Sequence, residues 1–404
     1  MKRQFLLYLF IILFLSITTT AVILYGKGYR LVPYQGKIGV LETGLLVATS
    51  RPNGAGVFIN GHLTSATDST INLSPGEYNV KIVKEGYFSW EKKIKIQKEV
   101  VSKAEALLFT TAPKLESITD SGVANPVLDP SGTQIAFTVA SQSARKNGLY
   151  ILDMSSKPIL TLQSALTQIA DDTIDTFSQS ELSWSPDGKE LLASVSGRLN
   201  TKTTYLLKKD FNQNPPDVTT TLGEVDALWK KQKEDKEQSR IAGLAPQLQN
   251  IILENFTLLS WSLDEAKILY QASRSASLPT IIDPPLIGTN PTTEERILKK
   301  GHIYIYDIKE DKNFKILDSI PNLQLTSYNL ELPLTWFPDS KHLIFVNNRK
   351  INIMDYDGTN KTVIYAGPFI EGFVAPWPDG SRLAILTNLG NENITPNLYT
   401  IGLK

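Results

Sequence analysis

The sequence has no cysteine. This absence excludes disulfides, thiolate metal sites, cysteine nucleophiles and the lipid-modified cysteine of a lipoprotein. An excess of one charge sign is also missing, because Lys plus Arg and Asp plus Glu both number 41. A nucleic-acid-binding protein usually shows a basic excess, so we predict that nucleic acid is not a partner.

Motifs for catalysis and for cofactors are absent as well. The chain has no Gly-x-Ser-x-Gly elbow, Gly-x-x-x-x-Gly-Lys loop, His-Glu-x-x-His helix or Gly-x-Gly-x-x-Gly turn. His62, His302 and His342 have no ligand spacing with one another, so we interpret them as solitary surface or turn histidines. Asp355-x-Asp357-Gly358 resembles the start of a calcium loop but lacks the remaining oxygen ligands. We therefore predict no catalytic, metal or cofactor-binding residues and no cofactor, and the partner-binding residues stay unknown.

One long apolar run stands at the N-terminus. Phe5 to Leu24 contains no charged residue, and 20 residues at about 1.5 Å each span roughly the 30 Å hydrocarbon core of a bilayer. A cleaved signal peptide is the alternative, but its apolar core would be only about 7 to 15 residues long. We predict an uncleaved anchor within residues 1–30. Lys2, Arg3 and the amino terminus precede the run and Lys27 and Arg30 follow it, and this small difference in positive charge favours a cytoplasmic N-terminus and soluble domains outside the cytoplasm.

After a linker at residues 31–44, short alternating apolar runs are separated by Gly, Pro and Asn, as in half-buried strands and their turns. Tyr78, Val80 and Ile82 share one face by the period of two, which predicts a one-sided sheet over a small core. The expected strands are Leu45 to Thr49, Val57 to Asn60, Thr70 to Leu73, Tyr78 to Val83, Trp90 to Ile96 and Ala104 to Phe109.

Four short motifs in this region carry a family resemblance. They are Arg51-Pro52-Asn53-Gly54-Ala55, Val57-Phe58-Ile59-Asn60-Gly61, Pro75-Gly76-Glu77-Tyr78 and Lys84-Glu85-Gly86-Tyr87. Their order and spacing resemble a PEGA domain, here taken as residues 45–112, although Asn53 replaces the acidic residue of the name-giving motif. The resemblance implies a small envelope-associated β-sandwich without a known catalytic site. The lysines Lys92, Lys93, Lys95 and Lys98 could attract an anionic wall polymer, but such a run is more often a solvated strand face.

The rest of the chain, residues 113–404, contains repeats. Five segments align on a Trp-Ser-Pro-Asp-Gly pattern, and an apolar strand follows most of them, as in the blades of a propeller. The segments are Pro126 to Phe137, Leu182 to Ala193, Leu259 to Tyr270, Leu334 to Phe345 and Val374 to Ile385. Pro presets the corner, Asp bonds its own backbone and Gly takes the left-handed exit. The whole resembles the TolB-type β-propeller, and the spare segment Lys114 to Thr119 is expected to close the ring with the last strand near Leu398.

The spacing of the corners is uneven, which predicts two insertions, near residues 223–256 and 273–300. The first has a helical stripe of apolar residues at Leu244, Leu248 and Ile252, whereas Trp229 to Arg240 is so charged that we expect a solvated helix or disorder there. The second is rich in Pro and Thr and reads as a surface loop.

These observations predict a mainly β protein with an N-terminal transmembrane helix, a PEGA-like β-sandwich and a propeller of about five recognisable blades with a helical insertion. We expect a non-catalytic, single-pass protein of the cell membrane that presents the propeller outside the cytoplasm to a protein or cell-wall polymer partner. Two alternatives stay open: a propeller hydrolase that uses channel carboxylates, and an interaction module facing the cytoplasm. The sequence leaves the oligomeric state open.

Overall fold

The computed structural model describes residues 2–26, 30–34, 37–140, 143–155, 166–197, 201–319 and 334–404. The chain divides into two compact units. Met1–Thr111 and Ile282–Glu294 make up unit 1, and Ala112–Ile281 and Glu295–Lys404 make up unit 2.

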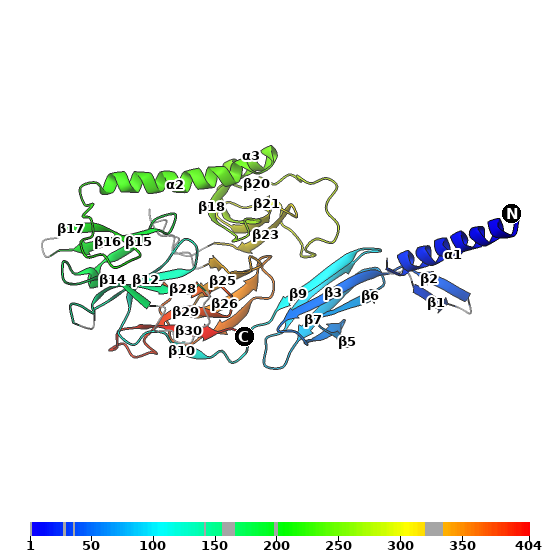
Figure 1. Ribbon diagram of the computed structural model, residues 1–404, viewed down its shortest axis with the longest axis horizontal. Helices are drawn as coiled ribbons and strands as arrows, with labels where there is room; N and C mark the ends of the chain where they lie inside the picture. Colours follow the sequence, from blue (N-terminus) through cyan, green and yellow to red (C-terminus); the bar gives the residue numbers. More distant parts are fainter. Residues whose placement is uncertain are drawn as a thin grey trace. The chain divides into compact units, whose positions relative to one another are not determined.

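Unit 1 begins with the helix α1 (Lys2–Gly26), which contains the predicted apolar run (Figure 1). Its apolar side chains are exposed along its whole length, as those of a helix surrounded by lipid would be. Within the described residues, α1 is the one helix long and apolar enough to cross a membrane, although a signal sequence has the same properties. Lys27, on which part of the orientation argument rests, lies outside the described residues.

The stretch expected to be a linker contains two short strands. β1 (Arg30–Tyr34) pairs with β2 (Lys37–Leu41) in an antiparallel register, with Arg30 opposite Leu41. The sequence does not indicate this pair, because a two-stranded ribbon has too few residues to show a clear alternation.

The following residues form a sandwich of two small sheets. One sheet has the order β6-β3-β9, with β9 parallel to β3, and the other has the order β5-β4-β7-β8. All six expected strands are present, and β5 is an additional one that its exposed side chains concealed. The strands are β3 (Gly44–Arg51), β4 (Gly56–Ile59), β5 (His62–Ala66), β6 (Ser69–Leu73), β7 (Gly76–Val83), β8 (Trp90–Ile96) and β9 (Val101–Leu107).

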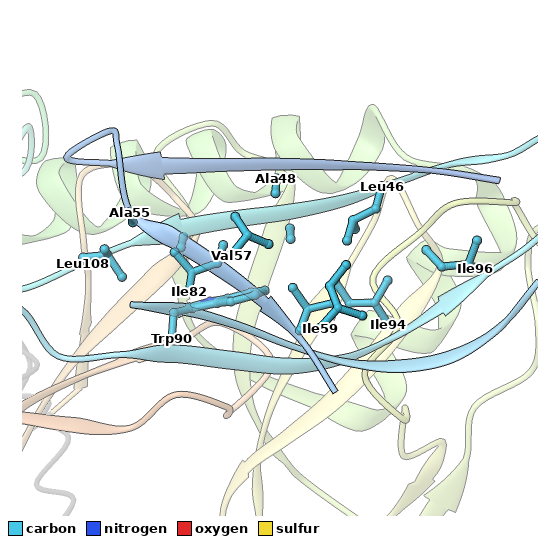
Figure 2. Close-up of a cluster of buried hydrophobic side chains, with 13 residues drawn as sticks. Leu46, Ala48, Ala55, Val57, Ile59, Ile82, Trp90, Ile94, Ile96 and Leu108 are labelled. Atoms are coloured by element: carbon cyan, nitrogen blue, oxygen red, sulfur yellow. The ribbon is translucent and has the colours of Figure 1, made fainter. Parts of the chain in front are cut away.

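The core of the sandwich lies between these sheets (Figure 2). Leu46 and Ala48 of β3 face Val57 of β4 and Ile82 of β7, and all four are fully buried. Val80 and Ile82 are buried while Lys81 between them is exposed, so the predicted alternation of β7 is confirmed.

In the residues that the structure describes, unit 2 is a β-propeller with five blades, numbered in chain order. Each blade is an antiparallel sheet, and successive strands pair from the inner strand outward. Blade 1 contains β11 (Ala124–Leu128), β12 (Gln134–Val139), β13 (Gly148–Asp153) and β14 (Leu166–Asp171). Blade 2 contains β15 (Glu181–Trp184), β16 (Glu190–Ser196) and β17 (Lys202–Lys208). Blade 3 contains β18 (Phe256–Trp261), β19 (Lys267–Ala272), β22 (Ile303–Asp307) and β23 (Lys312–Leu317). Blade 4 contains β24 (Leu334–Trp336), β25 (His342–Asn347), β26 (Lys350–Asp355) and β27 (Thr362–Tyr365).

The fifth blade closes the ring with both ends of the unit. Its order is β28 (Val374–Pro376), β29 (Arg382–Thr387), β30 (Asn397–Gly402) and then β10 (Leu115–Ser117). Leu115 lies opposite Ile401, and the amide of Ile118 donates to the Leu398 carbonyl at 2.8 Å. The expected closure between Lys114–Thr119 and the last strand is therefore confirmed. It covers the open edge of β30, which would otherwise expose unpaired backbone groups.

Blade 2 has no regular fourth strand because prolines occupy that place. The Leu206 amide of β17 donates to the Pro216 carbonyl at 3.0 Å, and the Val218 amide donates back to Thr204 at 2.8 Å. Pro216 has no amide hydrogen and cannot continue a ladder, so the segment covers the edge without forming a strand.

The first insertion is helical and ordered. It consists of α2 (Leu222–Ala242) and α3 (Pro246–Asn255), and Pro246 lies in the first turn of α3, where its missing amide hydrogen costs no hydrogen bond. The charged stretch from Trp229 to Arg240 belongs to the helix α2, so the alternative of disorder was wrong. The expected solvated helix is found for all of this stretch except Trp229, which is buried. Tertiary contacts of a few apolar residues suffice to hold a helix whose own sequence is polar.

The second insertion runs from Ser273 to His302 between two strands of blade 3. Its stem contains β20 (Ala276–Ser277) paired with β21 (Ile297–Leu298). The buried Asp311 carboxylate accepts hydrogen bonds from the Ile281 amide at 2.6 Å and from Arg296 at 3.3 Å, which fixes both sides of the stem.

Candidate functional site

The repeated corners between the first two strands of each blade are the most distinctive feature of the propeller. All five close with the same backbone hydrogen bond, 2.9 Å long, from the amide of the residue that follows the inner strand to the carbonyl of the residue that begins the next strand. The bonds join Asp129 to Gln134, Ser185 to Glu190, Ser262 to Lys267, Phe337 to His342 and Trp377 to Arg382. Corners that lack the Pro or Gly of the pattern therefore keep the same backbone geometry.

The fourth residue of each corner explains how corners without glycine keep this geometry, because it adopts a positive φ in blades 2, 3 and 4. Gly188 has φ of +67° there, whereas Glu265 and Ser340 adopt φ of +54° and +58° at the equivalent positions. A side chain in this region is strained, so blades 3 and 4 hold these residues there through the surrounding bonds. In blade 3, for example, the Glu265 amide donates to the Ser262 carbonyl at 2.9 Å.

The corner carboxylates and hydroxyls serve the turns themselves. The Ser185 hydroxyl accepts hydrogen bonds from the amides of Lys189 and Glu190 and donates one to Asp187 at 2.7 Å. In blade 1 the Asp129 carboxylate replaces that hydroxyl and accepts from the two equivalent amides, each at 2.7 Å. The hydrogen bond from Ser185 is the main reason that the pKa of Asp187 lies below its ordinary value. These side chains satisfy amides that a tight corner leaves without a ladder partner.

His342 forms a buried charged cluster in blade 4. It is 5% exposed and lies between two carboxylates, with Nδ1 at 2.7 Å from Asp339 and Nε2 at 3.3 Å from Asp355. Burial lowers the pKa of His342, but the hydrogen bonds and charges of Asp339 and Asp355 outweigh it and raise the pKa to about 9. The histidine is therefore a buried cation, and our interpretation of it as a solitary surface or turn residue was wrong.

The residue that begins the second strand is charged in blade 3 as well as in blade 4. The first residue of the second strand lies opposite the last residue of the third, which pairs His342 with Asp355 and Lys267 with Asp307. Lys267 is 7% exposed, lies 3.9 Å from Asp307 and stands 4.8 Å over the Tyr356 ring of the next blade. The sequence signal was the Asp that ends the apolar third strand of blades 1, 3 and 4, and it becomes meaningful only when the register is known.

The other predicted candidates do not come together into a site. His62 is exposed in the sandwich, and His302 lies in the propeller with Nδ1 at 3.5 Å from Asp318. The Asp357 carboxylate accepts from the amide and hydroxyl of Thr359, as expected for a strand-ending turn. Among the residues that the structure describes, no group of three or more His, Asp or Glu could hold a metal ion. The predictions of no metal and no catalytic residue stay predictions.

The lysines of the sandwich alternate with acidic residues across its outer face. Glu77 lies opposite Lys95, and Lys81 lies 3.7 Å from Glu91 on the neighbouring strand. Lys98 forms an ion pair with Glu42, and Lys92 stands 5.8 Å over the Trp90 ring. This mixture of signs favours a solvated strand face over a site for an anionic polymer.

The sandwich is matched by a known family model. Residues 43–108 match the PEGA domain. The match covers both sheets of the sandwich, from the start of β3 to the end of β9, and the resemblance noted in the sequence is thereby confirmed. The PEGA domain accounts for about a sixth of the chain, so it does not assign the whole protein to a family.

Solved structures similar to the chain are TolB proteins and another propeller. Putative TolB from Agrobacterium tumefaciens is 16% identical, with 69% of this chain and 72% of that one covered and a TM-score of 0.20. TolB from Acinetobacter baumannii is 12% identical, with 81% and 60% covered and a TM-score of 0.23. The β-propeller domain of the Trilobed protease from Pyrococcus furiosus is 13% identical, with 89% and 82% covered and a TM-score of 0.19.

Similarity at this level carries no argument about function, and the five blades are established by their strand pairing. The chain spans 60% of the length of the Acinetobacter protein. No curated protein matches the chain.

Proposed function

We propose that this protein is a non-catalytic binding protein of the cell envelope, anchored by α1, that presents its propeller to a protein or wall-polymer partner outside the cytoplasm. The observation that supports it best is the use of the repeated corner residues. The polar side chains that recur in the blades bond their own turns, as Asp129 and Ser185 do, and so contribute to the scaffold. A repeated scaffold with variable loops is typical of propellers that bind partners.

Two further observations favour the envelope. The helix α1 is long and apolar enough for a membrane anchor, and the PEGA resemblance implies a place among envelope-associated modules. The absence of cysteine is compatible with either side of a membrane and does not distinguish them.

Affinity capture with the full chain in detergent tests the binding role. The unaltered chain should retain a specific partner from envelope extracts, and Ile305→Asp should lose it. Ile305 is fully buried in blade 3, and an unpaired buried charge disrupts the propeller without altering the sandwich. Purified chain that hydrolyses glycans or peptides would contradict the proposal and favour the hydrolase alternative.

Protease treatment of intact cells tests the topology. Propeller fragments should be released from whole cells, while a tag placed before Lys2 stays protected. A propeller that is cleaved only after lysis would show that the soluble domains face the cytoplasm.

A further inference from the structure

The helices α2 and α3 of the first insertion pack against blade 2 on one side and blade 3 on the other. Adjacent residues of β16 face opposite ways, as the strand period requires. Leu191 joins the apolar cluster shared by blades 1 and 2, whereas Leu192 joins a cluster with Trp229 of α2. The face of blade 2 that points away from blade 1 therefore packs on a helix.

Blade 3 shows the complementary arrangement. Leu269 and Ile305 join a cluster with Trp336 of blade 4, whereas Ile268 and Tyr270 join a cluster with Ile252 of α3 and Ile241 of α2. Figure 1 shows α2 running from the blade that contains β16 and β17 to the blade that begins with β18. The helices α2 and α3 thus stand between blades 2 and 3, where a neighbouring blade stands elsewhere in the ring.

The two ends of this helical element are held very differently. On blade 3, its buried residues belong to a cluster of eleven buried side chains. Arg240 adds two hydrogen bonds to Glu265 of the corner, 2.8 and 2.6 Å long, and stands 5.7 Å over the Trp261 ring. On blade 2, the cluster has three buried residues, Leu192, Val218 and Trp229.

The blade 2 contact is also the smallest of the apolar clusters in the part of the chain that the structure describes. The cluster between blades 1 and 2 contains twelve buried residues and the one between blades 5 and 1 contains thirteen. The N-cap residue Thr221 makes no side-chain hydrogen bond to the start of α2, so this end lacks that stabilisation too. Native proteins open first where the least apolar surface is buried.

We propose that the propeller opens at the seam between blade 2 and α2, with α2 and α3 remaining on blade 3. The seam is defined by Leu192, Leu206 and Val218 on the blade side and by Leu222, Val225 and Trp229 on the helix side. Opening exposes an apolar face of blade 2 without breaking any strand pair. This inference concerns the fold and does not depend on the proposed partner-binding function.

Thiol labelling of the full chain tests the seam directly, because the protein has no other cysteine. Leu192→Cys and Leu191→Cys are matched variants, because both replace a buried leucine of β16 by the same smaller side chain. Leu192 faces the helix α2, whereas Leu191 faces blade 1. Leu192→Cys should be labelled at least tenfold faster than Leu191→Cys under native conditions, and Leu248→Cys on the blade 3 side should be as slow as Leu191→Cys. Equal rates for Leu192→Cys and Leu191→Cys, or a faster Leu248→Cys, would overturn the proposal.

Hydrogen exchange of the unaltered chain gives an answer that does not depend on the variants folding. Amides in the first half of α2 should exchange faster than those of α3, although α3 is the shorter helix and would fray more readily if packing did not hold it. Protection of α2 equal to or greater than that of α3 would show that the seam does not open first.

Discussion

The fold makes a buried cation of His342. Its pKa of about 9 in the folded protein lies above the ordinary value of 6.5 expected in the unfolded chain. The cation's contribution to stability is therefore fully present below pH 6.5 and is lost as the pH rises through 9. The shift corresponds to roughly 3 kcal/mol.

We predict that the free energy of unfolding of the propeller falls between pH 6.5 and pH 9.5, and that this fall is largely absent in His342→Asn. The neutral amide fits near both carboxylates but does not titrate, so the variant should be less stable at pH 6 and closer to the unaltered chain at pH 9.5. Chemical denaturation at several pH values measures it, and parallel pH profiles for the two proteins would contradict the assignment of the buried charge.

Two corner tryptophans provide a matched test of one hydrogen bond. The Trp184 Nε1 donates to the Val127 carbonyl of the preceding blade at 3.2 Å, whereas the buried Trp336 Nε1 has no hydrogen-bond partner among the residues that the structure describes. Both indoles are about equally buried. Trp184→Phe should therefore cost about 1 kcal/mol more than Trp336→Phe, since only the first loses a bond between protein groups. Thermal or denaturant unfolding gives the difference, and a larger loss for Trp336→Phe would refute it.

At the scale of elements, the short strand β10 joins the two ends of the propeller. Three residues close the ring by pairing with β30 across nearly the whole length of the propeller sequence. Glu116 lies opposite Thr400. The amide of Ile118, two residues further on, donates to the Leu398 carbonyl. Because alternate residues of an antiparallel strand hydrogen-bond on the same side, the Glu116 amide also faces β30.

Glu116→Pro should therefore destabilise the propeller by at least about 1 kcal/mol, because proline removes the ladder donor. Glu116→Ala is the control: it loses the same exposed side chain, including its 3.9 Å ion pair with Arg382, but keeps the amide. Calorimetry should show a lower midpoint for the proline variant alone, and equal midpoints would mean that β10 adds little to ring closure.

At the scale of the molecule, the two units have separate apolar cores. Leu46 is fully buried in the sandwich and Ile305 is fully buried in blade 3. Leu46→Ala should lower the free energy of unfolding of the sandwich by about 2 to 5 kcal/mol, and Ile305→Ala should lower that of the propeller by a similar amount. Hydrogen exchange followed by mass spectrometry can assign each loss to its unit, and a single transition that both variants lower equally would show that the units unfold together.

The sequence alone determined the elements whose signal is local. The charge-free run of α1, the alternation in β7, the Trp-Ser-Pro-Asp-Gly corners and the pairing of the two ends of the propeller were all readable, because each depends on residues close in the chain or on a repeated pattern. Turn chemistry and strand period are properties of a few neighbouring residues.

Only the tertiary structure decided what His342, Trp229 and Leu192 do. His342 lies between two carboxylates because the register places Asp355 opposite it, and the corner brings Asp339 to its other side. The charged sequence of α2 gives no sign that Trp229 packs on Leu192 of blade 2. Burial and pairing between distant residues fix both the charge of the histidine and the place of the helix, and neither is written in the local pattern of the chain.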